Sequence, residues 1–306
     1  RQGSDNRAFH LMLLVPVLLL FIYNILPIPA GILMAFQNFH PMKGFLHSSF
    51  VGLANFKKLM LLPDTWPAVR NTLIIAIGKI IGNLVVPISF ALLLNEIRVR
   101  WFKRAAQTIT YLPYFLSWVV LGGILIKFLS PGSSSSTPGF LNTLLVNLHI
   151  IKEPIYFLGS NSTFRGTMII SDIWKNFGYF MVLYLSGLST ISGEYYDAAK
   201  VDGANAVQCF FKITLPLLRP ITTFVVVQGA IGGFQLFDEA KTLVSGSGST
   251  IVGGPGRSLL TIVWYFYDSS FQNNSRYGYG AAIAFSMLII IAAISFLNVR
   301  LLREKE

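Results

Sequence analysis

The chain has 306 residues, of which 53% are hydrophobic and only 12% are charged, and its mean hydropathy is +0.61. Soluble globular domains carry about 25% charged residues, so this composition excludes a soluble protein and predicts an integral membrane protein. The net charge of +11 does not indicate nucleic-acid binding, because many of the bases lie between apolar runs, where cytoplasmic loops collect them.

Six apolar runs in the chain are long enough to cross a membrane as helices, which requires about 20 residues each. The first exceeds the core of a cleavable signal peptide, so we interpret it as a retained transmembrane helix. The expected spans are 11–36, 71–95, 105–126, 166–191, 221–243 and 277–299. The predicted fold class is therefore all-α, with residues 1–306 forming a single polytopic domain of six transmembrane helices.

Clusters of basic residues set the orientation of these spans. The densest lies at 98–104, between the second and third runs, and another at 300–305 follows the last run. Because cytoplasmic loops are enriched in Lys and Arg, we assign both clusters and both termini to the cytoplasm. On the opposite side, two loops contain apolar segments at 138–151 and 258–271 that are too short to cross.

The longest polar break in the second half of the chain runs from Glu194 to Pro220. Its pattern predicts two short helices joined by a turn at Gly203, since glycine readily takes the left-handed geometry that ends a helix. We expect Pro216 to stop the second helix and Pro220 to begin the next membrane helix. Alanines at 198 and 199 leave a helix face of little bulk, which another protein could approach closely.

This stretch resembles the EAA loop of ABC importer permeases, in which Glu-Ala-Ala, three residues, Gly, nine residues and Ile-x-Leu-Pro recur. Asp197 stands where that family usually has Glu. The resemblance implies that residues 191–220 form a cytoplasmic loop that inserts into a groove of the ATP-hydrolysing subunit. The residues it assigns to this contact are Glu194, Asp197, Ala198, Ala199, Asp202, Gly203, Ile213, Leu215 and Pro216. An ordinary cytoplasmic helical hairpin is the alternative interpretation.

Further segments resemble carbohydrate permeases of the same class, and together they cover the chain from about residue 11 to 303. They are FVGLANFKKLM with RNTLI, YLPYFLSWVVLGGILIKFL, FQLFDEAKTL, GGPGRSLLTIVWYFYDSSF and YGYGAAIA. The resemblance implies the type I ABC importer permease fold and the multi-pass transmembrane subunit of an ATP-driven importer of oligosaccharides or polysaccharides. Such a subunit works by alternating access in the bacterial cytoplasmic (inner) membrane.

The same resemblance implies a set of partners. These are a second homologous permease chain, two ATP-binding subunits, an extracytoplasmic solute-binding protein, the oligosaccharide and membrane lipids, with no nucleic acid. ATP and Mg would be bound by the partner ATPase, and we expect no cofactor in this chain. Lys79 follows Gly78 but is followed by Ile80, so the chain has no Walker A motif.

We expect neither an enzyme nor a metal site. The sequence contains no paired-His zinc motif, no nucleophile elbow and no acid–base dyad. Its single cysteine, Cys209, excludes an internal disulfide and a cysteine-based metal site.

Charged residues inside membrane spans are costly and usually functional. Asp172 and Lys175 can share one face of the fourth span. Two interpretations stay open: they neutralise each other, or they face the substrate pathway. Of the fifth-span candidates, we expect Gln235 to be more deeply buried than Asp238 and Glu239, for which solvent exposure near the outer boundary is the alternative to a pathway role. The full set of pathway candidates is Asp172, Trp174, Lys175, Asn176, Tyr179, Gln235, Asp238, Glu239, Trp264 and Tyr265. Helix packing and an interfacial aromatic belt are the alternatives for the aromatic members.

Two other functions compete with an ATP-driven importer. An ion-coupled secondary transporter would need an acidic relay near the midplane, for which Asp172 is the candidate. A membrane scaffold without transport activity is the other. As for the substrate, the basic excess favours acidic sugars such as alginate or pectin fragments, although the positive-inside rule accounts for the same excess.

Overall fold

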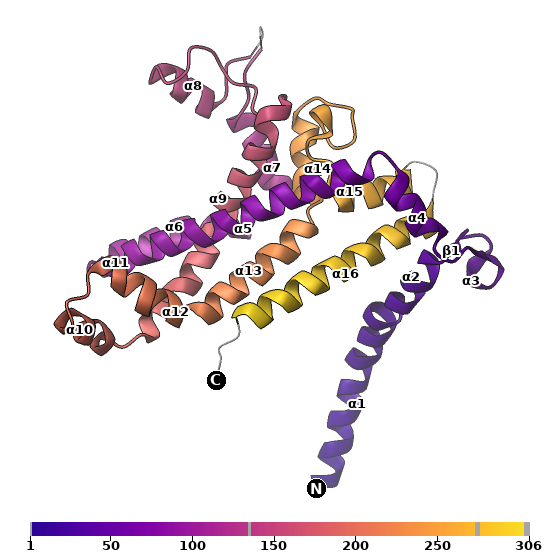
Figure 1. The fold of residues 1–306 in the computed structure, drawn as a ribbon, viewed down its shortest axis with the longest axis horizontal. Coiled ribbons are helices and arrows are strands. Elements are labelled where there is room, and N and C mark those ends of the chain that lie inside the picture. Colours follow the sequence, from indigo (N-terminus) through magenta and orange to yellow (C-terminus); the bar gives the residue numbers. More distant parts are fainter. Residues whose placement is uncertain (1, 134–135, 273–275, 303–306) are drawn as a thin grey trace. The chain divides into compact units, whose positions relative to one another are not determined.

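The computed structural model describes residues 2–133, 136–272 and 276–302, and these are almost entirely helical (Figure 1). The predicted all-α class is confirmed. Contacts group the chain into two compact units, residues 1–66 with 265–289 and residues 67–264 with 290–306, which we describe separately. The expected basic residues Arg303 and Lys305 lie outside the described residues.

The first unit begins with a long apolar stretch and continues through short elements. Prolines at 16, 27 and 29 remove backbone donors along this stretch, and a π-helical turn separates its two α-helical parts. The two short strands pair antiparallel. The elements are α1 (Gln2–Leu20), η1 (Phe21–Ile25), α2 (Pro27–Ala35), β1 (Gln37–Asn38), α3 (Gly44–His47), β2 (Ser49–Phe50), α4 (Ala54–Leu61), η4 (Asp268–Gln272) and the first half of α16 (Tyr277–Leu302).

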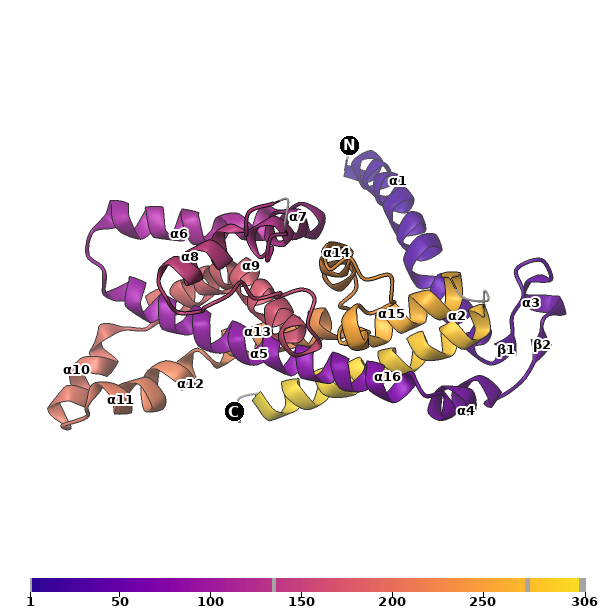
Figure 2. The same cartoon turned by 90° about the horizontal axis from the view of Figure 1, so that it is seen from above.

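The second unit is built around a long helix, α5 (Thr65–Glu96), that packs against α9 (Asn161–Thr190) and α13 (Arg219–Phe234) (Figures 1 and 2). Small residues make these contacts close, as is usual between membrane helices. Gly78 and Gly82 of α5 receive isoleucine side chains from α9. Further elements of this unit are α6 (Arg100–Phe115), α7 (Trp118–Phe128), α8 (Phe140–Asn147), α14 (Asp238–Gly246), η3 (Pro255–Arg257) and the first half of α15 (Ile262–Tyr267).

Two of the predicted spans are not continuous helices. Three described helices are each long and apolar enough to cross a membrane, at Leu11–Ala35, Thr65–Glu96 and Tyr277–Leu297, and two bent pairs could raise the number to five. The predicted span 105–126 is wrong as a straight helix, because α6 and α7 meet at 104°. Pro113 lies in the last turn of α6, and Ser117 caps α7 by accepting a hydrogen bond from the Val120 amide. The count of six spans stays a prediction.

The predicted span 221–243 is also interrupted. Helix α13 ends at Phe234, and the separate helix α14 begins at Asp238. The turn between them is held by Thr261, whose hydroxyl donates a hydrogen bond to the Leu236 carbonyl at 2.7 Å. The short apolar segments predicted at 138–151 and 258–271 do contain short helices, α8 and α15.

The helix–turn–helix expected after residue 191 is present. It consists of α10 (Gly193–Val201), α11 (Ala206–Cys209), η2 (Phe210–Thr214) and α12 (Leu215–Leu217). Gly203 has a φ of +78°, the left-handed geometry that the sequence predicts. The helical run that begins at Ala206 ends at Leu217, one residue after Pro216, and α13 follows at a bend of 70°, as the expected stop at Pro216 predicts. Pro220 lies in the first turn of α13, as predicted.

A close approach between α6 and α9, which lie side by side in Figure 2, depends on Gly178. A Cβ at this position would overlap the backbone carbonyl of Thr110. We therefore expect Gly178→Ala to lower the free energy of unfolding by about 1–3 kcal/mol through overpacking. The measurement is the thermal unfolding midpoint of the detergent-solubilised protein. Gly166→Ala is the control, because this glycine is on the same helix and has open space around it. Equal midpoints for the two variants would contradict the prediction.

Candidate functional site

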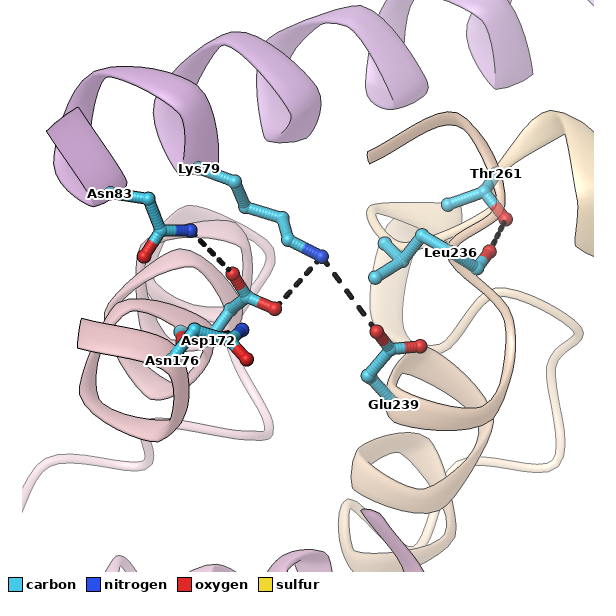
Figure 3. A network of polar contacts seen from close by, with 7 residues as sticks. All are labelled: Lys79, Asn83, Asp172, Asn176, Leu236, Glu239 and Thr261. Carbon is cyan, nitrogen blue, oxygen red and sulfur yellow. Dashed lines mark hydrogen bonds and ion pairs between the residues drawn. The ribbon is translucent and has the colours of Figure 1, made fainter. Parts of the chain in front are cut away.

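A buried cluster of charged side chains joins three helices of the second unit. The Lys79 Nζ atom on α5 lies 2.9 Å from Asp172 Oδ1 on α9 and 3.7 Å from Glu239 Oε1 on α14 (Figure 3). Asn83 donates a hydrogen bond from Nδ2 to Asp172 Oδ2 at 3.1 Å. The side chains of Lys79 and Asp172 are only 5% and 2% exposed. An unpaired charge at this depth would be costly, so the cluster must be satisfied internally.

Helical spacing brings the members of the cluster together. Lys79 and Asn83 are separated by one helical turn on α5, and Asp172 and Asn176 are likewise separated on α9, so each pair shares a face. Asn176 donates a hydrogen bond from Nδ2 to the Asp172 carbonyl at 3.0 Å. Glu239 lies in the first turn of α14, where the helix dipole favours a carboxylate.

A cavity of about 180 Å³ adjoins this cluster. Its wall combines carboxylate, ammonium and amide groups with the rings of Tyr114, Trp118 and Tyr179. The Tyr114 and Tyr179 rings are stacked, with centroids 4.5 Å apart and an angle of 9° between their planes. The other lining residues are Lys79, Asn83, Asp172, Asn176, Phe180, Gln228, Gly229, Gly232 and Glu239. Such a wall can exchange hydrogen bonds with hydroxyl groups and cover the apolar face of a ring.

The interpretation that Asp172 and Lys175 neutralise each other is wrong. Asp172 pairs with Lys79 instead. The Lys175 ammonium donates hydrogen bonds to the carbonyls of Pro113, Tyr114 and Leu116, at 3.3, 2.8 and 2.7 Å. The physical reason is that the break between α6 and α7 brings the carbonyls of Tyr114 and Leu116 within reach of Lys175, while α5 brings another ammonium to Asp172.

Sequence reasoning missed Lys79 and Asn83 as site residues. In the sequence, Lys79 interrupts the second apolar run and follows Gly78 in a pair that does not form a Walker A motif. The signal that could have found it is that Lys79 is the single charge in the run 71–95. Charges within membrane spans usually have a functional role and a partner.

Among the predicted pathway residues on α9, Asp172, Asn176 and Tyr179 border the cavity. Trp174 does not, and its side chain is 42% exposed on the described chain. Lys175 is buried behind the wall rather than at its surface.

The predicted residues after α13 divide in the same way. Glu239 borders the cavity, whereas Asp238 is exposed at the start of α14. The expected deeper burial of Gln235 is wrong, because α13 ends before it and leaves its side chain exposed while that of Glu239 is 15% exposed. Trp264 is buried with its ring edge-on to Phe237, and it does not border the cavity.

Tyr265 belongs to the first unit and lies outside the cavity wall. Its hydroxyl is 2.8 Å from that of Tyr279. This contact gives the tyrosine a packing partner within its own unit.

The predicted coupling residues lie on an accessible surface. Glu194, Asp197, Ala198, Asp202 and Gly203 are exposed on α10 and the turn after it. The others, Ala199, Ile213, Leu215 and Pro216, are half-buried. A groove of about 930 Å³ separates this segment from the ends of α5 and α9.

One contact ties the two arms of the coupling segment together. The hydroxyl groups of Tyr196 on α10 and Thr214 at the end of η2 are 2.9 Å apart. A side-chain hydrogen bond therefore holds α10 against the end of η2, in addition to the turn at Gly203.

A family model described as "Binding-protein-dependent transport system inner membrane component" matches residues 87–305. The chain belongs to this family. The expectation of an ABC importer permease is thereby confirmed, as is that of a transport subunit rather than an enzyme. A curated relative, the arabinooligosaccharides transport system permease protein AraP of Bacillus subtilis (strain 168), is 31% identical over 97% of this chain and 89% of its own length.

Two solved structures share the fold. One is a bacterial ABC transporter involved in the import of the acidic polysaccharide alginate, with 26% identity, a TM-score of 0.79 and coverage of 98% of this chain and 96% of that chain. The other is a bacterial alginate ABC transporter in complex with an alginate pentasaccharide-bound periplasmic protein. It has 25% identity, a TM-score of 0.79 and coverage of 99% and 96%. The type I permease fold is therefore confirmed.

We predict that Lys79 and Asp172 compensate each other. Lys79→Met or Asp172→Asn alone leaves one charged group of the cluster short of its partner, which costs about 3–5 kcal/mol for a buried pair. Each single change should lower the yield and thermal unfolding midpoint of the solubilised protein. The double change should recover part of the loss.

The matched control is the pair Asp172→Asn and Lys175→Met, whose effects should add because these side chains form no ion pair. Additive effects for Lys79→Met and Asp172→Asn, with compensation between Asp172 and Lys175, would contradict the pairing.

Proposed function

We propose that this chain is one of two related transmembrane subunits of an ATP-driven importer that moves oligosaccharides or polysaccharides by alternating access. The observation that carries the proposal is the polar and aromatic cavity between α5, α9, α13 and α14 of a binding-protein-dependent permease. Stacked tyrosine rings and amide and carboxylate groups suit a sugar, which has an apolar ring face and hydroxyls around its edge.

Two observations support acidic sugars among the possible substrates. The chain has a net charge of +11, and one structural neighbour imports alginate. The curated name of AraP supports arabinooligosaccharides as another possibility. A substrate panel should therefore contain both acidic and neutral oligosaccharides.

The partners we propose follow from the family. A second permease chain would complete the pathway, two ATP-binding subunits would hold ATP and Mg, and an extracytoplasmic protein would deliver the sugar. The last of these is supported by the alginate transporter solved with its periplasmic protein. We place the chain in the bacterial inner membrane with both termini cytoplasmic, supported by the bases at 98–104 and Arg300.

The connection between the coupling segment and the cavity supports a mechanism. Helix α12 leads directly into α13 through a bend of 70° between the two arms of this helix pair. Residues Gln228, Gly229 and Gly232 of α13 border the cavity. We expect closure of the ATP-binding subunits to displace α10–α12, and α13 to transmit that displacement to the cavity wall.

The ion-coupled alternative finds less support than the ATP-driven one. Its candidate relay residue, Asp172, is engaged by Lys79 and Asn83. These contacts account for the buried carboxylate as the counter-ion of Lys79, without a role as an ion carrier.

The direct test is uptake into vesicles that contain the reconstituted complex with ATP inside. Tyr179→Leu removes one of the stacked rings of the cavity. It should raise the half-saturating sugar concentration about two- to tenfold, because an aromatic contact contributes about 0.5–1.5 kcal/mol beyond its buried area. Trp174→Leu is the control from the same helix, since its ring does not border the cavity. Sugar-independent ATP hydrolysis with no uptake of any sugar in the panel would refute the proposed function.

The coupling role predicts a defect of a different kind. Gly203 has a positive φ, so Gly203→Val should strain the turn by about 1 kcal/mol or more and change the surface that meets the ATPase. We expect weaker co-purification of the ATPase, or ATP hydrolysis without transport. Gly193→Val is the control, since Gly193 has open space around it and no left-handed φ. Normal assembly and normal uptake for Gly203→Val would contradict the coupling role.

A further inference from the structure

The break between α6 and α7 exposes backbone carbonyls that need partners. The last carbonyls of a helix have no intrahelical donor, and the bend of 104° prevents α7 from continuing the hydrogen-bond ladder. At membrane depth water does not replace the missing donors, so non-helical backbone is tolerated only where the protein satisfies it.

Lys175 on α9 supplies these donors. Its ammonium has three N–H groups, and the structure gives it three acceptors: the carbonyls of Tyr114 and Leu116, and that of Pro113, which also accepts a hydrogen bond from the Leu116 amide. The residue is 7% exposed, and it forms no ion pair with a carboxylate in the described part of the chain. A cation is also favoured at the carboxyl end of a helix by the helix dipole. The side chain therefore acts as a cap on α6 that comes from another helix.

The same ammonium lies behind the aromatic wall of the cavity. Its Nζ atom is 5.6 Å from the centre of the Tyr114 ring and 5.7 Å from that of Trp118, distances that allow cation–π contact. Both rings border the cavity, whereas Lys175 does not. Tyr179, one turn after Lys175 on α9, stacks on the Tyr114 ring.

We infer that Lys175 is a positioning residue for sugar recognition: it fixes the bend between α6 and α7 and thereby the place of Tyr114 and Trp118 in the cavity wall. This inference rests on the proposed transport function and deepens it. The role differs from both roles that the sequence suggests for Lys175, a counter-ion for Asp172 and a direct contact to the sugar. Asp172 of α9 points toward Lys79 of α5 in Figure 3.

The test compares two variants. Lys175→Met keeps approximately the length of the side chain and removes all three N–H donors, whereas Lys175→Arg keeps the positive charge and N–H donors. Two quantities are measured in the reconstituted complex. One is sugar uptake, separated into half-saturating concentration and maximal rate. The other is the distance between spin labels on Ile109 of α6 and Ile124 of α7, both exposed, in a chain whose Cys209 is replaced by serine.

We expect Lys175→Met to raise the half-saturating concentration about tenfold or more, in line with the loss of hydrogen bonds to a charged group. The maximal rate should be retained and the spin-label distances should broaden. Lys175→Arg should restore both. Lys127→Met is the control, since this lysine is exposed in the last turn of α7 and should leave both quantities unchanged.

An unchanged half-saturating concentration and an unchanged distance distribution in Lys175→Met would overturn the inference. So would a fall in maximal rate alone, which indicates a general structural role. If the Met variant does not assemble, Lys175→Gln, which keeps two N–H donors, takes its place with the same expected and contrary results. Failure of the parent complex to transport any sugar would refute the proposed function, while the spin-label distances would still decide the role of Lys175 at the bend.

Discussion

The ion pair between Lys79 and Asp172 is the constraint on which the second unit depends. Both side chains are buried, and each would carry an uncompensated charge if its partner helix moved away. Glu239 adds a weaker third contact at 3.7 Å and extends the pairing from α5 and α9 to α14. A cluster of this kind holds three helices together and also places polar groups in the wall of the cavity. The same residues therefore stabilise the helix packing and line the candidate site.

At the breaks in the helices, the backbone groups also find their partners within the protein. Two segments that the sequence suggests as continuous spans are interrupted, and at each break a polar side chain from elsewhere satisfies the freed backbone. Lys175 does so at the end of α6, and Thr261 does so after α13. The broken ends shape the cavity, because Tyr114, Trp118 and Glu239 all lie next to them. A pair of straight helices would not present these groups together.

The coupling segment and the cavity are parts of one continuous path along the chain. A hydrogen bond between Tyr196 and Thr214 connects the two helical parts of the segment, which then leads into α13 at a bend. Helix α13 contacts α5 through Gly233, where an added Cβ would crowd Ala76. Because packed helices move as rigid elements, a displacement at one end of α13 is available to the cavity at the other. This physical continuity is what the proposed ATP-driven transport requires of the chain.

The sequence by itself determined the properties that depend on local pattern. Composition established a membrane protein, and the spacing from Asp197 to Pro216 predicted the paired helices, the positive φ of Gly203 and the family, with the matched region 87–305 containing all of that stretch. These predictions agree with the structure because the turn geometry and the motif spacing depend on a stretch of only about twenty residues.

Only the tertiary structure decided which charges meet. From the sequence, Lys175 is the natural partner of Asp172, since it lies one turn away on the same helix. The structure instead brings Lys79 to Asp172 from α5 and gives Lys175 the carbonyls of a helix end that the apolar run 105–126 does not reveal. The physical reason is that pairing in a low-dielectric interior is settled by which helices pack together, and that packing is non-local.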